Sequence, residues 1–470
     1  MNKLSRGVII PHAGQSYSGM ARDACLAYLP RTTKKIIYLA ALHQLDNTEN
    51  VYVLDTEIDF LTKLEMSDIP FMVDDNISNN EHSYQWVKDE LLAYFNPGVK
   101  ILAIAPSNKT DINILVNWLI SIFDNDTVLI ATTDLTHYGT KFNNDGSLDY
   151  PEQLGKLRRE ERLILGLTKT NITSVESTLH NIACGTYAVL TFIHFADRMN
   201  WLGRVVDYYD SHHINNMSDK LSLYTIDHNN VSEFVSYVSI VYGNYTKNIV
   251  NKILPVDIYL ALGLFKSIIN YQKLDISKVA LKKFKLPIWS SLTSLKNGVF
   301  MGTELDIQTN CCTGIFQSRT DNLSKNINNA SRNCFSDAND RWDIPYTGVD
   351  LNELTYKIDI LDDVTNWKSY PSNVAEQVFS MNGKYGMQIQ FKNGNTAIFI
   401  PQVAEDNRDN WDIVTYMRNL TEKAYQTNDV NNKRDNKDNK DNWKRSGNII
   451  KIFSSKSYKF NPRKNILHKI

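Results

Sequence analysis

Four side chains in the first half of the chain are of types that can hold a metal ion or move a proton. They are His12, His43, Asp134 and His137, and each follows a short apolar segment. Neutral imidazole is a good ligand for transition metals and accepts a proton near neutral pH, and a carboxylate can share both roles. A single histidine at a strand end is more often a structural hydrogen-bonding group, so a functional site requires several of these side chains to meet.

The elements that would bring them together alternate along the first half of the chain. Apolar segments that we expect to be buried strands are 7–10, 35–42, 100–105, 127–133 and 234–241. Segments with helical periodicity are 83–95, 112–123, with Asp111 as its N-cap, and 153–167. This alternation predicts an α/β domain with a largely parallel sheet flanked by helices. Ligands bind beyond the carboxyl ends of parallel strands, so three strand ends are expected to place the candidate residues at one edge.

The second half of the chain has a different pattern, after a polar stretch at 243–251. Expected helices at 256–271 and 412–425 enclose strand-like segments at 298–305, 313–317, 355–361, 386–391 and 397–401. Strands in sequence with few intervening helices predict a smaller α+β domain with antiparallel pairing.

Composition changes again near the end of the chain. The segment 427–442 is almost wholly Asn, Asp, Lys and Arg, which indicates a loop insertion. The last 27 residues, 444–470, hold eight Lys or Arg and no acid, with a strand expected at 449–453. We favour a solvated basic tail over an arm that binds nucleic acid.

Composition excludes several other classes of protein. A chain of 470 residues exceeds one comfortable core and predicts two domains. Lys and Arg number 51 against 52 Asp and Glu, so no overall field attracts nucleic acid or anionic lipid. No segment is typical of a signal peptide or a membrane span. The five cysteines form no disulfide framework, so we expect a cytoplasmic or otherwise intracellular protein.

Three further residues are of types that could belong to a site. Cys184 could be a nucleophile near histidines, but its apolar neighbours favour a buried packing role. His212 and His213 lie in a polar stretch and stay open as ligands or as solvent-facing residues.

Several short motifs in register give residues 4–242 a resemblance to the Memo family, which is related in fold to the class III extradiol dioxygenases. The motifs are Pro11-His12-Ala13-Gly14 with Tyr17 and Gly19, the strand leading to His43, Glu81-His82-Ser83, Asp134 with His137-Tyr138-Gly139, and Asn181 with Cys184-Gly185. The resemblance implies a pocket with His12, Asp134 and His137 as catalytic residues.

For members of the Memo family that bind metal, the resemblance implies that a second histidine and a cysteine also hold the ion, which is iron or copper. Here the family's paired histidines appear as His43-Gln44, so Gln44 replaces an expected ligand. Glutamine binds divalent iron or copper less well than imidazole. The family's cysteine aligns with Ile214, beside His213. The implied metal ligands are therefore His12, His43 and His213.

The second half resembles the AMMECR domain over roughly 252–427 and the tail strands. The family's Leu-Arg-Gly-Cys-Ile-Gly-Thr-Phe stretch appears at 309–316, keeping Cys312, Gly314 and Phe316 but with Asn310 in place of the arginine. Later matches are Asp340-Arg341-Trp342, 385–389, 400–404 and Trp411-Asp412. Asparagine replaces the planar guanidinium poorly, so an anion contact is not expected here. Adjacent Cys311 and Cys312 are expected to pack rather than bind metal.

These observations predict a fusion of two domains, 1–245 Memo-like and 252–427 AMMECR-like, with a polar insertion at 428–448 and a basic tail at 449–470. One reading is an enzyme acting on a small molecule, in which His12 binds a metal or a substrate oxygen and Asp134 and His137 move a proton. The alternative is a non-catalytic binding or scaffold protein that recognises a peptide or an anionic ligand. Because both families accompany a radical-SAM protein in prokaryotic genomes, the resemblance implies such a protein as a partner.

Overall fold

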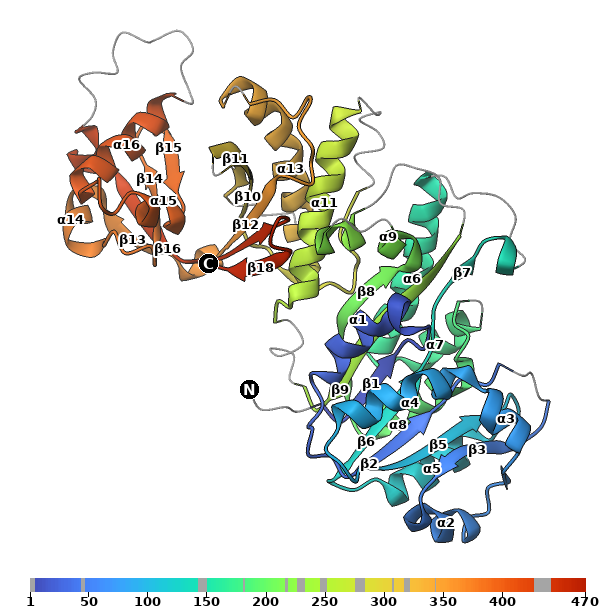
Figure 1. Cartoon of the computed structure of the whole chain (residues 1–470). Helices are drawn as coiled ribbons and strands as arrows, with labels where there is room; N and C mark the ends of the chain where they lie inside the picture. Colours follow the sequence, from blue (N-terminus) through green and yellow to red (C-terminus); the bar gives the residue numbers. More distant parts are fainter. Residues whose placement is uncertain are drawn as a thin grey trace. The chain divides into compact units, whose positions relative to one another are not determined.

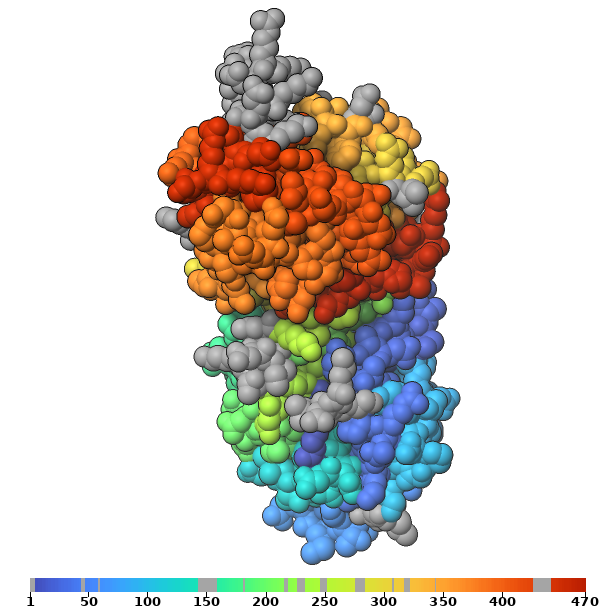
Figure 2. All heavy atoms as spheres, turned by 90° about the vertical axis from the view of Figure 1, so that its left-hand side faces the viewer, coloured from blue at the N-terminus to red at the C-terminus, as the bar shows by residue number. Residues whose placement is uncertain are grey.

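The computed structural model describes most of the chain. The described residues are 5–43, 47–142, 150–180, 182–215, 219–225, 233–245, 252–274, 284–306, 308–316, 322–342, 344–426 and 441–470. The others are drawn in grey in Figures 1 and 2. The chain divides into two compact units, one of residues 1–267 with 286–294, the other of 268–285 with 295–470. The candidate residues of the first half all lie in unit 1.

Unit 1 contains a mixed sheet of nine strands (Figure 1). Its strands are β1 (Gly7–Ile10), β2 (Lys35–Leu39), β3 (Val51–Thr56), β4 (Phe71–Met72), β5 (Lys100–Pro106), β6 (Thr127–Thr132), β7 (His137–Tyr138), β8 (Leu202–Asp210) and β9 (Phe234–Gly243). The order is β4-β3-β5-β2-β6-β1-β9-β7, with β8 paired to β9. The central strands β5, β2, β6 and β1 are parallel, whereas β7, β8 and β9 pair antiparallel. The expected parallel sheet is therefore confirmed at its centre.

Helices cover both faces of this sheet. They are α1 (Gln15–Leu26), α2 (Ile58–Glu65), α3 (Asp75–Asn80), α4 (His82–Tyr94), α5 (Ile112–Ile122), α6 (Tyr150–Thr168), α7 (Ile172–Leu179), α8 (Thr186–Arg198) and α9 (Ser211–Asn215), with the 3-10 turns η1 (Thr140–Phe142) and η2 (Lys220–Tyr224). Successive side chains of a strand point to opposite faces of the sheet. Ile9 therefore packs in the core between the sheet and helices α5 to α8, whereas Val8 and Ile10 pack in the core on the other face, with α1 and α4. Asp111 caps α5 as expected, accepting from the backbone N–H groups of Asn113 and Ile114.

Unit 2 contains two antiparallel sheets. The five-stranded sheet has the order β11-β10-β12-β17-β18 and the four-stranded sheet β13-β16-β14-β15. Their strands are β10 (Val299–Leu305), β11 (Gln308–Ile315), β12 (Thr355–Leu361), β13 (Lys368–Pro371), β14 (Gly386–Gln390), β15 (Thr396–Phe399), β16 (Ile449–Phe453), β17 (Ser455–Asn461) and β18 (Ile466–Lys469). The basic tail thus supplies three strands: β16, which the sequence indicated at 449–453, and β17 and β18, whose bounds it did not indicate.

The remaining helices belong mainly to unit 2. They are α11 (Pro255–Lys273), which runs from unit 1 into unit 2, α13 (Leu323–Asp340), α14 (Ala375–Val378), α15 (Pro401–Asp406) and α16 (Ile413–Gln426), with short 3-10 turns η3 (Ser291–Ser294), η4 (Val364–Asn366), η5 (Ser372–Val374) and η6 (Asn442–Lys444). None of the helices within the described ranges has an apolar stretch long enough to cross a bilayer.

Two further features of unit 2 differ from the expectations. The helix α13 was missed because its sequence is rich in Asn and Ser, although its buried positions Leu323, Ile327, Ala330, Cys334 and Ala338 recur at helical spacing. Cys311 of β11 is joined to Cys334 of α13 in a disulfide, with the two Cα atoms 5.5 Å apart. The expectation that Cys311 only packs is therefore corrected, because strand and helix bring together two cysteines that are 23 residues apart.

Candidate metal centre in unit 1

His12 lies directly after β1 and is buried, held through both its backbone and its ring. Its backbone N–H donates to Asp134 Oδ1 at 2.9 Å, and its Nδ1 lies 3.0 Å from Thr132 Oγ1. These contacts arise because β1 and β6 pair in parallel with Ile10 opposite Thr132, so the two strands end side by side. The expected meeting of His12 and Asp134 at one sheet edge is what the structure shows.

The hydrogen bonds of Thr132 determine which nitrogen of His12 carries the proton. Thr132 Oγ1 donates its single hydrogen to the carbonyl oxygen of Ile10 at 3.0 Å. It must therefore accept from His12 Nδ1, because a hydroxyl has only one proton to give. The lone pair of neutral His12 is then on Nε2, where it can bind a metal or accept a proton.

His43 follows β2 and is held by Glu81 in the same way. Its Nδ1 lies 2.8 Å from Glu81 Oε1, and its backbone N–H donates to Glu81 Oε2 at 2.8 Å. Burial would raise the pKa of Glu81, but hydrogen bonds from the His43 ring and backbone and from Ser83 lower it to about 2. An ionised carboxylate only accepts, so His43 Nδ1 is the donor, and Nε2 is the ring nitrogen that remains for a metal.

His82, the first residue of α4, completes a cluster of three histidines. The ring centroids of His43 and His82 are 4.0 Å apart, and those of His12 lie 5.1 Å from His43 and 5.8 Å from His82. One nitrogen from each of the three rings lies within 4.8 Å of the others, so the cluster could hold a metal ion. The start of α4 is fixed beside β2 because Ser83 Oγ donates to the Ala41 carbonyl oxygen and Tyr38 Oη donates to that of Ser83.

The surroundings disfavour the protonated form of two of these imidazoles, His12 and His82. Burial lowers the pKa of His12 well below its usual value, and repulsion from His43 and His82 adds to the effect. Burial, followed by repulsion from His43, also lowers the pKa of His82. Neutral imidazole is the form that binds a transition metal, so the lowered pKa values of His12 and His82 fit such an ion.

Asp134 and His137 stand next to the cluster. Asp134 Oδ2 lies 3.8 Å from His12 Nε2, and burial raises the pKa of this carboxyl above its usual value. His137 Nδ1 lies 2.8 Å from the carbonyl oxygen of Leu135, which can only accept, so Nδ1 is the donor. His137 is near enough to influence the protonation of His12, and it also shifts the pKa of Asp134 downward.

Comparison with known proteins assigns both parts of the chain. A model of the Memo-like protein family matches residues 2–225, and a model of the AMMECR1 family matches residues 265–439. The chain joins a Memo domain to an AMMECR1 domain. Among solved structures, the uncharacterized protein PH0010 from Pyrococcus horikoshii is 16% identical over 45% of this chain and 94% of that chain, with a TM-score of 0.33. No curated protein matches the chain.

Cys184 of the Memo domain lies against His12. Its Sγ is 3.4 Å from His12 Nε2, and the backbone N–H of Asp134 donates to it at 3.3 Å. Burial raises the pKa of this thiol above its usual value. Sequence reasoning favoured a packing role in apolar surroundings, whereas the structure shows a partly exposed thiol beside a candidate ligand.

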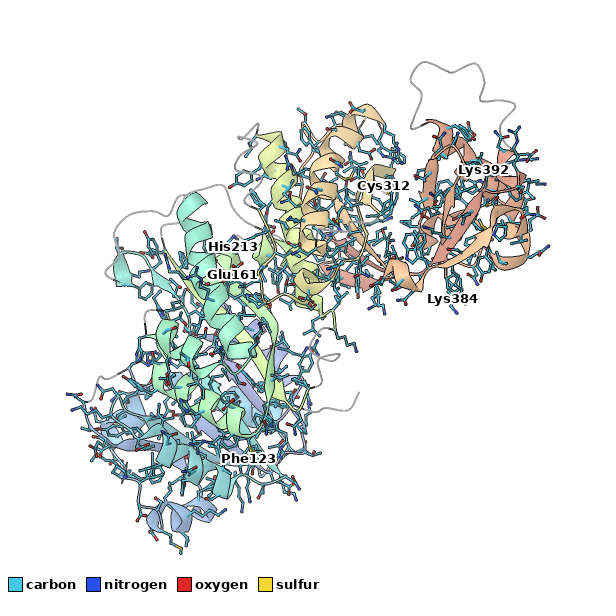
Figure 3. The ribbon with its side chains drawn as sticks, turned by 180° about the vertical axis from the view of Figure 1, so that it is seen from behind. Phe123, Glu161, His213, Cys312, Lys384 and Lys392 are labelled. Atoms are coloured by element: carbon cyan, nitrogen blue, oxygen red, sulfur yellow. A yellow bond between two sulfur atoms is a disulfide. The ribbon has the colours of Figure 1, made fainter. Side chains whose placement is uncertain are left out.

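The remaining ligand candidates of the Memo domain lie in other surroundings. His213 and Ile214 belong to α9, where His213 Nδ1 lies 2.7 Å from Asp210 Oδ1 (Figure 3 labels His213). Among the described residues, the cluster that could share one ion contains His82 and does not contain His213. Gln44 and Asn181 lie outside the described residues. In the sequence, Glu81-His82-Ser83 indicates only the start of a helix. In the structure Glu81 holds His43 rather than its neighbour His82, so this motif did not mark His82 as a ligand.

In the AMMECR1 domain, the degraded motif is part of the packed structure. Asn310, in place of the family's arginine, is buried, accepts from Thr303 Oγ1 at 2.8 Å and donates to the Ile344 carbonyl oxygen. Gly314 lies against the ring of Phe300, so a side chain would not fit there. Cys312, labelled in Figure 3, is a free, partly exposed thiol.

Proposed function

We propose that the Memo domain is a metal-dependent enzyme that acts on a small molecule at the cluster of His12, His43 and His82. The observation that carries the proposal is the convergence of three imidazoles, two of which are held at Nδ1 by Thr132 and Glu81, so that Nε2 is the ring nitrogen left to face an ion. A histidine held by a carboxylate or hydroxyl in this way is the usual arrangement of a metal ligand. Iron or copper, the ions implied by the resemblance, accept imidazole ligands.

The chemistry would be divided between the ion and the neighbouring side chains. A bound divalent ion would supply Lewis acidity and positions for a substrate oxygen. Asp134, with its raised pKa, is suited to hold or release a proton beside His12, and His137 is suited to accept one at Nε2. Glu81 and Thr132 would keep the ligand rings in place.

The test is metal binding by the full chain, stripped of metal and titrated separately with Fe(II), Cu(II) and Zn(II). The indole of Trp86 lies against His82, with ring centroids 4.7 Å apart and the ring planes tilted by 47°, so Cu(II) in the cluster should quench its fluorescence. We expect the wild-type chain to bind one ion and His12→Ala to bind none. The control His468→Ala, a matched change at an exposed histidine of the tail, should still bind the ion. A wild-type chain that binds none of the three ions would contradict the proposal.

Turnover distinguishes an enzyme from a binding module. Asp134→Asn should retain the ion, because Asp134 is not one of the three clustered ligands, yet lose turnover in a screen of small molecules. If the loaded wild-type chain binds molecules from the screen without converting any, the alternative of a non-catalytic binding protein is favoured.

A further inference from the structure

We infer that Arg22 is a positioning residue, which holds the turn that carries His12 in register with the helix that carries His82. The consequence for metal binding rests on the proposed function, whereas the positioning itself does not. Arg22 lies on α1 and is fully buried, although the other buried positions of that helix are small or apolar: Ser18, Gly19, Ala21, Cys25 and Leu26. A buried guanidinium requires a partner for its charge and for its N–H groups.

One side of the guanidinium holds the turn between β1 and α1. Arg22 Nη1 donates to the carbonyl oxygen of Ala13 at 2.6 Å and approaches that of Pro11 at 3.4 Å. These two carbonyl groups flank His12 in the chain. Ser18 Oγ donates to the same Ala13 oxygen at 2.7 Å, so the peptide that joins Ala13 to Gly14 is held twice.

The other side of the guanidinium holds α4. Arg22 Nε donates to Glu90 Oε2 at 2.6 Å, and Nη2 donates to Glu90 Oε1, so the ion pair is bidentate. Glu90 lies on the same helix as His82, about two turns after it. The pair therefore joins the backbone around His12 to the helix whose first residue is His82.

The planar shape of arginine suits this role. Its five N–H groups point in fixed directions and can serve a carboxylate and two carbonyl groups at once, whereas lysine has three donors on one atom. A conservative Arg22→Lys substitution keeps the charge beside Glu90 but cannot keep both sets of contacts. This variant therefore tests whether the position of His12 depends on the contacts of the guanidinium or only on a positive charge beside Glu90.

The experiment compares Arg22→Lys and Glu90→Gln with a control elsewhere in unit 1. Lys266→Met removes the cation from another buried pair, Lys266 with Asp219, whose side chains are 8% and 2% exposed and whose charged atoms are 3.6 Å apart. All three variants are expected to lower the melting temperature. Hydrogen exchange of peptides that cover residues 8–14 distinguishes positioning of His12 from a general loss of stability. In this segment the His12 amide is bonded to Asp134.

We expect exchange at 8–14 to become about tenfold faster or more in Arg22→Lys and Glu90→Gln and to stay unchanged in Lys266→Met. Metal affinity should fall about 10- to 100-fold in the first two variants alone, the loss typical of groups that support a ligand. Wild-type exchange at 8–14 in a folded Arg22→Lys chain would overturn the inference. If the wild-type chain binds no metal, the proposed function fails, but the exchange measurement still decides the positioning role.

Discussion

Glu81 accepts from both the ring and the backbone of His43, at 2.8 Å each. The same carboxylate caps α4 by accepting from the Ser83 N–H, so it fixes His43 and the start of the helix that carries His82. Glu81→Gln should lower metal affinity about 10- to 100-fold, measured by titration of the metal-free chain, because the amide binds the His43 ring less strongly.

The control for Glu81→Gln is Asp111→Asn at the N-cap of α5. Asp111 has the same capping role but accepts from the backbone N–H groups of Asn113 and Ile114 rather than from a histidine, and its loss should cost at most about 1 kcal/mol. Equal metal affinity in the two variants would show that Glu81 acts only as a cap.

Thr132→Val should weaken metal binding by freeing the His12 ring. Valine has nearly the shape of threonine but cannot accept from Nδ1, so His12 could carry its proton on Nε2 and block the ligand lone pair. We expect about a tenfold loss of affinity. Thr191→Val is the matched control, since Thr191 is buried and its Oγ1 has no hydrogen-bond partner within the described chain. Unchanged affinity in Thr132→Val would contradict the assigned tautomer.

Asp359 should make the stability of unit 2 depend on pH. Burial raises the pKa of this carboxyl to about 6, so the folded state favours the protonated form. The protonated carboxyl of Asp359 stabilises the folded state fully below its pKa in the unfolded chain, which is about 4. This contribution falls by about 3 kcal/mol as the pH rises through 6. Urea unfolding should therefore show Asp359→Asn to be more stable than the wild type at about pH 8, with the advantage shrinking towards about pH 4.

The control for Asp359 is an aspartate with the opposite trend. Hydrogen bonds from the backbone and side chain of Thr365 lower the pKa of exposed Asp363, so its contribution is present at neutral pH and is lost on acidification. Asp363→Asn should therefore not gain stability at high pH. The same gain in both variants would show that net charge, rather than burial, explains the Asp359 result.

The disulfide between Cys311 and Cys334 should make unit 2 sensitive to reductant. It closes a loop of 23 residues, for which loop entropy predicts a stabilisation of about 3 kcal/mol. The oxidised wild type should lose stability on reduction, whereas Cys334→Ala should be insensitive. Cys25→Ala, at a buried free cysteine of unit 1, should keep the full response to reductant. Intact-mass measurement that finds all five cysteines alkylated without reduction would exclude the bond.

Much of unit 1 could be predicted from the sequence because its signals are local. The limits of β1 and the cap of α5 depend on residues that are neighbours in the chain, and both were predicted. The edge at which His12, His43 and Asp134 lie follows from parallel pairing, which the alternation of strands and helices indicates. The polar sequence of α13 concealed a helix whose buried face depends on packing against β10 and β11.

The sequence by itself determined that strand ends in unit 1 carry imidazole and carboxylate groups, since apolar periodicity and the residue types after it are properties of the chain. Only the tertiary structure decided which groups share a centre. It brought in His82 because α4 begins beside the end of β2, and it set the ligand nitrogens through Thr132 and Glu81. Such contacts join residues up to 122 positions apart and are short-ranged, so they exist only once packing has fixed the strands and helices within ångströms.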